Sequence, residues 1–177
     1  EKMRITEGLP PMELGSSSFS DREDKRTIIF DSGIGKELQD SLALAAAIRA
    51  FPEGLRLVTA QPAAAIELKM RTKLIAKMMK LGNSQSGEIA VGKELSIHET
   101  RDRSPLARVA GTFTAESYGI PISQDAAGAI VRIVMRAEVL PVVFIATGGF
   151  ENLERALELE PFISTRISLL ATSGESQ

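Results

Sequence analysis

A glycine-rich segment, Gly33 to Lys36, is the first part of the sequence whose residue types and spacing suggest a chemical role. It follows an apolar run and precedes a helical pattern, which is where glycine-rich loops hold phosphate groups. The spacing does not fit either phosphate motif. Phe30 occupies the first glycine position of the G-x-x-x-x-G-K loop, and Glu37 replaces its Ser or Thr. The third glycine of the dinucleotide-binding pattern falls on Leu38. The segment therefore does not predict a phosphate site.

Other polar residues stand at the ends of apolar runs. Asp31 ends the run that begins at Thr27, and Thr147-Gly148-Gly149 follows the run from Pro141 to Ile145. In an open parallel sheet, ligands bind where the carboxyl ends of the strands converge. These residues, together with segments 59–65 and 92–98, are therefore the candidates for a binding site.

Each candidate also has a purely structural interpretation. Asp31 is a common type of residue in a loop after a strand, and Asp40 near a helix start can simply favour the helix dipole. Thr147 to Gly149 can form a tight turn, with Asn152 capping the next helix. His98 is the only histidine, and in an irregular segment such a residue is more often exposed than catalytic.

Hydrophobic periodicity predicts the elements that must position these residues. Short β-branched runs alternate with stretches whose apolar residues recur at helical spacing, which indicates parallel strands with helices packed on both faces. The predicted strands are 27–31, 55–59, 88–91, 141–145 and 167–171, and the predicted helices are 38–51, 66–82, 125–137 and 153–159. The predicted class is α/β, with a Rossmann-like open parallel sheet.

Composition narrows the function further. The 177 residues are long enough for one core, and the net charge of -2 includes no long basic block, which argues against nucleic acid as a partner. The chain has no cysteine, which excludes disulfides and thiolate metal sites. No apolar run is long enough to cross a bilayer, and the charged start is not followed by a signal-peptide apolar region. A cytoplasmic location is the default expectation.

Two segments lack a regular period. Residues 1–25 contain Pro10, Pro11, Gly15 and a serine run, which is typical of a flexible leader. Residues 92–121 are rich in charge, Ser, Pro and Gly, and a loop of this length in a compact domain is usually functional or disordered. We therefore expect one folded domain from residue 26 to 177.

The segment from Ile29 to Leu44, IFDSGIGKELQDSLAL, resembles the opening motif of nucleoside hydrolases. That motif is Asp-x-Asp, a glycine, an Asp-Asp pair and a helix rich in Ala and Leu, here with extra residues between the acidic groups. A second segment, ATGGFENL from Ala146 to Leu153, resembles the family's Thr-Gly-Gly-Leu-Thr-Asn turn. Segments 67–74 and 87–92 look like the helix and strand between the motifs. The resemblance covers about residues 26–174 and implies an incomplete carboxyl-terminal part.

The resemblance implies hydrolysis of the N-glycosidic bond of a ribonucleoside, with a bound calcium ion holding the ribose hydroxyls and the attacking water. It places Asp31 as a catalytic residue and metal ligand, and Asp40 and the Thr147 carbonyl as further metal ligands. It places Gln39 and Asn152 at the substrate. A nucleoside or sugar is the implied partner, in a protein of a family that commonly forms homo-oligomers.

Several residues of the family pattern differ here. The second Asp of Asp-x-Asp is Gly33, and the first Asp of the pair is Gln39, which carries no charge. The polar position after the second strand falls in Ala63 to Ala65, and the family's late Asp and His lie beyond residue 177. Glu37 is a poor substitute, because a solvated position near a helix start suits it better. Two hypotheses follow: an N-riboside hydrolase, or a catalytically inactive homologue retained for ligand binding or assembly.

Overall fold

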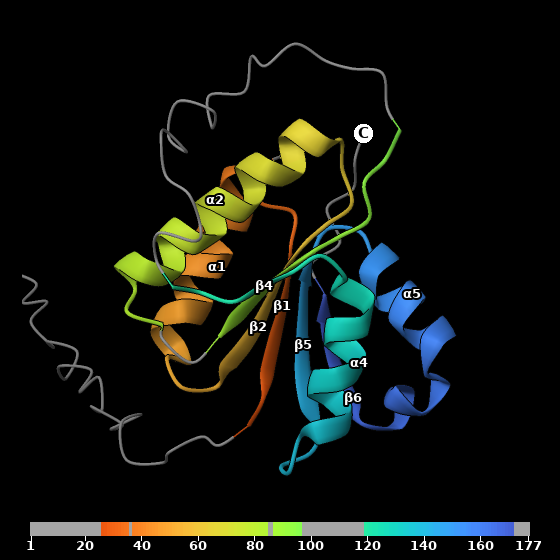
Figure 1. Ribbon diagram of the computed structural model, residues 1–177. Coiled ribbons are helices and arrows are strands. Elements are labelled where there is room, and N and C mark those ends of the chain that lie inside the picture. Colours follow the sequence, from red (N-terminus) through yellow and green to blue (C-terminus); the bar gives the residue numbers. More distant parts are fainter. Residues whose placement is uncertain (1–25, 36, 85–86, 97–118, 172–177) are drawn as a thin grey trace, which may run out of the picture.

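The computed structural model describes residues 26–35, 37–84, 87–96 and 119–171. The predicted leader, His98 and most of the irregular segment before Pro121 lie outside these ranges. Within them the chain forms a six-stranded, all-parallel sheet in the order β4-β3-β2-β1-β5-β6, which confirms the predicted α/β class (Figure 1). The strands are β1 (Ile28–Ser32), β2 (Leu55–Ala60), β3 (Glu88–Val91), β4 (Ile122–Ser123), β5 (Val142–Thr147) and β6 (Ile167–Ala171).

Helices cover both faces of the sheet. Helices α1 (Leu38–Ala50) and α2 (Ala65–Leu81) lie on one side, and α4 (Ala126–Arg136) and α5 (Glu151–Leu159) lie on the other (Figure 1). Each face has its own hydrophobic cluster. Neither cluster contains a cysteine or a tryptophan, so the fold depends on aliphatic and phenylalanine packing.

Strand β1 shows why the sequence folds this way. All five of its residues are buried, and its side chains alternate between the two clusters. Ile28 and Phe30 pack with the α1 and α2 side, whereas Ile29 packs with the α4 and α5 side. A continuous β-branched and aromatic run is therefore required, because neither face of this central strand meets water.

The strand order reverses next to β1. From β1 the chain moves through α1 to β2 on one side, whereas β5 lies on the other side of β1 and continues through α5 to β6. The carboxyl ends of β1 and β5 are thus a topological switch point, where the two crossovers leave in opposite directions, which is where open parallel sheets bind ligands. The register pairs Asp31 with Ala146 and Ser32 with Thr147 across this point.

The predicted elements agree with the structure apart from their ends and two edge strands. Strand β4 was not predicted, because a strand of two residues has no periodicity. Helix α4 follows it, and the Asp125 side chain caps this helix by accepting a hydrogen bond from the Gly128 amide. Strand β6 lies where expected, but Leu169 and Leu170 are 50% and 59% exposed, which differs from a buried strand. The reason is its place at the sheet edge. Among the described residues, no helix is long and apolar enough to span a bilayer.

Candidate functional site

Asp31 lies at the centre of the switch point, near the carboxyl end of β1. Its side chain is completely buried. The Oδ1 atom accepts hydrogen bonds from Thr59 Oγ1 on β2 and from Asn152 Nδ2, at 2.9 Å, on α5. The Oδ2 atom has no hydrogen-bond partner among the described residues. One oxygen is therefore fixed by neighbours from both sides of the sheet, and the other is available for a ligand or a proton.

Burial changes the acidity of this carboxyl group. Loss of solvation raises the pKa of Asp31 from 3.8 to about 6, and the nearby Glu151 carboxylate adds to the rise. Hydrogen bonds from Thr59 and Asn152, and a smaller contribution from the Gln61 side chain, act in the opposite direction, because they favour the ionised form. A carboxylate with a pKa close to neutrality can accept a proton at pH 7 and release it again, which is what a general base requires.

The raised pKa predicts a pH-dependent loss of stability. The folded protein holds the Asp31 proton more tightly than the unfolded chain, so the associated stabilisation is full below pH 3.8 and lost as the pH rises through about 6. Between pH 4.5 and 7.5 this loss is about 2 kcal/mol of unfolding free energy. Denaturant unfolding in EDTA at both pH values measures it, and Asp31→Asn should lack this component. Identical pH profiles for the two proteins would contradict the assignment.

Three oxygen atoms converge beside the loop that follows β1. A Cβ atom built on Gly33 would lie 2.6 Å from the Thr147 carbonyl oxygen, 3.0 Å from Asp40 Oδ2 and 3.4 Å from Gln61 Oε1. Asp40 is 7% exposed, in the first turn of α1, although it carries a carboxylate. The three oxygens come from three separate crossovers and surround one point. Such a cluster can hold a cation or ligand hydroxyl groups.

Gln61 lies in the predicted candidate segment 59–65 and is the first residue after β2, but it was not singled out as a site residue. The polar position of this loop was expected at Ala63 to Ala65, whereas Gln61 is the side chain that reaches the site. It is 1% exposed, its Nε2 donates to the Gly149 carbonyl oxygen at 3.0 Å, and its Oε1 has no partner among the described residues. The signal that would have found it is a lone polar residue immediately after a buried strand.

The glycines after β5 make room for this amide. A Cβ atom on Gly148 would lie 2.7 Å from both the Nε2 and the Oε1 of Gln61, and Gly148 has a φ of 151°, which side chains rarely adopt. The turn is therefore more than a generic connection between strand and helix. It lets the Gln61 amide lie directly against the backbone next to the Thr147 carbonyl.

Asn152 does not cap α5. Its Nδ2 donates to Asp31 Oδ1 and, at 3.1 Å, to the Ala60 carbonyl oxygen, and the side chain is buried. We therefore expect Asn152→Ala to raise the pKa of Asp31 further, because a bond that favours the ionised form is removed. Thr59→Val, which removes the other donor, should act in the same direction. The carboxyl carbon shift of Asp31, followed by NMR over pH, measures both, and an unchanged midpoint in either variant would argue against these contacts.

The remaining sequence-predicted positions lie outside the cluster. Gln39 and Glu37 are exposed at the start of α1, so in this conformation neither forms part of the buried set of oxygens. Ala63 is buried and pairs with Glu94 in an isolated bridge. The structure thus brings together Asp31, Asp40, Thr147 and Asn152, adds Gln61, and leaves Gln39 at the surface.

The donor set determines which cation would fit. Among the described residues there is no group of three or more His, Cys, Asp or Glu side chains placed to hold a metal. A cation here would depend on one close carboxylate together with amide and carbonyl oxygens. Calcium accepts such neutral oxygen ligands in flexible geometry, whereas magnesium requires near-ideal octahedral geometry. The residues therefore fit a weakly held calcium ion better than a magnesium ion.

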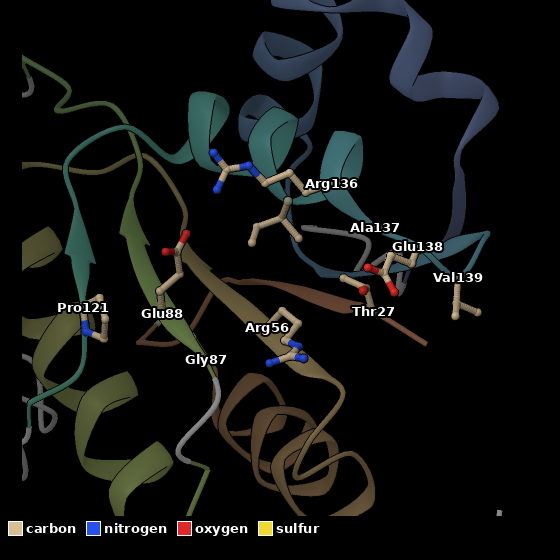
Figure 2. Close-up of a pocket in the computed structure, with 10 residues that line it drawn as sticks. Thr27, Arg56, Gly87, Glu88, Pro121, Arg136, Ala137, Glu138 and Val139 are labelled. Atoms are coloured by element: carbon tan, nitrogen blue, oxygen red, sulfur yellow. The ribbon is translucent and has the colours of Figure 1, made fainter. Parts of the chain in front are cut away.

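A hollow opens at the opposite end of the sheet. It has a volume of about 510 Å³ and includes Arg56 from β2, Glu88 from β3 and Arg136 from α4 (Figure 2). Glu88 already forms an ion pair with Arg132. The hollow lies at the amino ends of the strands, whereas open parallel sheets bind ligands at the carboxyl ends. The switch point therefore remains the candidate site.

Comparison with known proteins gives similarity in structure only. No protein-family model matches the sequence, and a search of curated proteins gives no match. Solved structures do match. An inosine-uridine preferring nucleoside hydrolase from Bacillus anthracis is 18% identical with a TM-score of 0.63, over 86% of this chain and 52% of that one. An inosine-guanosine nucleoside hydrolase is 21% identical with a TM-score of 0.66, over 85% and 50%.

A third match is the type III effector protein XopQ, solved in complex with adenosine diphosphate ribose. It is 16% identical with a TM-score of 0.60, over 84% of this chain and 44% of that one. This chain therefore spans about half the length of the solved structures it matches. At these identities the likeness establishes architecture, and it agrees with the resemblance read from the two sequence motifs. Over that shared length, the chain has the α/β fold of the nucleoside hydrolases.

Proposed function

We propose that the protein hydrolyses the N-glycosidic bond of a ribonucleoside or a related N-riboside. The observation that carries the proposal is the pairing of a buried Asp31 carboxyl, with one unpartnered oxygen, and a cluster of oxygens from Asp40, Thr147 and Gln61. Both lie at the switch point of a fold shared with nucleoside hydrolases. A cluster of buried polar groups of this kind suits a small sugar-containing ligand with several hydroxyl groups.

The cluster supplies the negative and partially negative groups that the reaction needs. Cleavage of an N-glycosidic bond develops positive charge on the sugar, and fixed carboxylates and carbonyl dipoles stabilise that charge. Asp40 and the Thr147 carbonyl are the oxygens that would hold a calcium ion. When bound, calcium would orient the ribose hydroxyls and make a water molecule more acidic.

Asp31 is the proton acceptor in this proposal. As water attacks the anomeric carbon, the bond to the base nitrogen breaks and the bonding electrons leave with the base, while a water proton moves to Asp31 Oδ2. Thr59 and Asn152 hold Oδ1, so the side chain cannot rotate away. No atom of Asp31 is among the three heavy atoms nearest to a Cβ atom built on Gly33, whereas Asp40 Oδ2 is. We therefore assign proton transfer to Asp31 and cation binding to Asp40.

A substrate panel tests the proposal. The purified protein is incubated with purine and pyrimidine nucleosides and with adenosine diphosphate ribose, in calcium and in EDTA, and released reducing sugar is measured. We expect release from at least one N-riboside in calcium. No release above the blank from any member of the panel would defeat the hydrolase assignment.

One observation favours a second candidate function, ligand binding without turnover. The family's second Asp is Gly33 here, and the close Thr147 carbonyl leaves no space for a side chain at that position. A homologue retained for binding would still hold a riboside at the switch point. Calorimetry with ribose, taken together with the substrate panel, distinguishes the two candidates: ribose binding without turnover supports retention for binding, whereas turnover of any N-riboside contradicts it.

A further inference from the structure

Hydrogen bonding within the protein accounts for the nitrogen of the buried Gln61 amide but not for its oxygen. The side chain is 1% exposed, yet Oε1 has no partner among the described residues. A buried carbonyl oxygen without a partner costs about 1–3 kcal/mol, so such an atom in a native structure needs a reason. Its position suggests one, because Oε1 lies 3.4 Å from the point where a Cβ atom of Gly33 would stand.

Two neighbouring contacts fix the direction of this oxygen. Gln61 Nε2 donates to the Gly149 carbonyl oxygen, which turns the other end of the amide toward Gly33. The Gln61 backbone carbonyl accepts a hydrogen bond of 3.2 Å from Arg71 Nη1, and Arg71 is itself 1% exposed and paired with Glu67 at 2.6 Å. A buried arginine thus anchors the main chain of the residue whose side chain faces the cluster.

We propose that Gln61 supplies the oxygen ligand that Gly33 cannot supply, so that a calcium ion would be held by Asp40, the Thr147 carbonyl and Gln61 Oε1. The absence of a side chain at residue 33 leaves room for these oxygens around one point. The glycine in the loop after β1 and the long amide side chain in the loop after β2 thus act together. Only one of the three ligands carries a formal charge, so the site binds calcium weakly.

The proposal makes opposite predictions for two substitutions at residue 61. Gln61→Glu keeps the oxygen and adds a negative charge, and we expect calcium to bind about tenfold more tightly. Gln61→Leu removes the oxygen, and we expect calcium to bind about tenfold more weakly or not measurably. Calorimetric titration of the whole protein with calcium chloride measures both. Gln124→Glu adds the same charge on an exposed residue after β4 and should leave the affinity unchanged.

The sign of the change separates a ligand from a structural residue. Both substitutions remove the bond from Nε2 to Gly149, so a Gln61 that only fixed the turn would weaken calcium binding in both variants. That result, or equal affinity in all variants, would overturn the proposal, and so would a lack of calcium binding by both the wild type and Gln61→Glu. The assignment rests on the proposed function only in taking calcium as the ligand. If the affinities change as expected while no N-riboside is cleaved, Gln61 remains a ligand and the hydrolase assignment fails.

Discussion

Replacing Asp31 by Asn is expected to lower the rate of N-riboside hydrolysis by about 10²- to 10⁴-fold, the usual contribution of a general base. The amide keeps an oxygen that can accept bonds from Thr59 and Asn152, so the loop geometry should be retained. It cannot accept the proton from water. In the wild type, kcat/KM should rise with pH through about 6, because the ionised form of Asp31 is the active one.

Two measurements make this prediction specific. The first is the pH profile of the residual activity, which should lose its rise near pH 6 in Asp31→Asn. The second is a matched carboxylate-to-amide control, Glu158→Gln, on an exposed residue of α5 whose ion pair with Arg155 lies at the surface. Surface pairs contribute about 0–1 kcal/mol, so this variant should behave like the wild type. A fully active Asp31→Asn protein would remove Asp31 from the mechanism.

Placing an aspartate at position 33, where the nucleoside hydrolase motif that this segment resembles has one, is expected to damage the protein. In Gly33→Asp the new Cβ would meet the Thr147 carbonyl oxygen at 2.6 Å, closer than real Cβ atoms approach other atoms, and Asp40 Oδ2 at 3.0 Å. The backbone at both loops must move, and overpacking of this kind costs about 1–3 kcal/mol. The added carboxylate also faces Asp40, which raises the cost. We expect lower unfolding free energy and no gain in hydrolysis.

Gly33→Ala separates the steric cost of a side chain at residue 33 from the electrostatic cost of a carboxylate beside Asp40. It introduces the same Cβ atom without the charge, so it should lose about 1–3 kcal/mol of unfolding free energy in denaturant titrations. The additional loss in Gly33→Asp then measures repulsion from Asp40, and calcium should reduce that additional loss. If Gly33→Asp were instead as stable as the wild type and more active, the loop after β1 would adopt a different conformation from the one described, and the crowded position of Gly33 would be wrong.

The sequence was sufficient to predict the central strands because burial dictates their composition. Residues 28–30 and 142–146 are continuous apolar runs, since strands covered on both faces are built mainly from apolar residues, and polar residues enter only where the strands end. Strand β4 could not be predicted, because Ile122 and Ser123 pair with only two residues of β3 and have no pattern of their own. The exposure of Leu169 and Leu170 could not be predicted either, since it depends on which strand lies at the edge.

The candidate site was predicted in part. Asp31, Asp40 and Thr147 follow from motif spacing and from the rule that loops converge at the carboxyl ends of parallel strands. Gln61 lies in the predicted segment 59–65 but was not singled out, because the resemblance aligned the polar position of this loop with Ala63 to Ala65, whereas the first side chain after β2 is Gln61. Gln39 is exposed, because the helical turn that buries Asp40 directs the preceding residue outward, and its contact with a substrate stays a prediction.

The oxygens around Gly33 come from residues 40, 61 and 147, which are far apart in sequence and close together only when β1, β2 and β5 are aligned. In an unfolded chain this cluster does not exist. Any ligand that uses all three oxygens must therefore bind the native state alone, and mass action then raises resistance to unfolding by RT ln(1 + [L]/Kd). For such a ligand, a concentration series of melting curves would report occupancy of the cluster even in a protein that performs no catalysis.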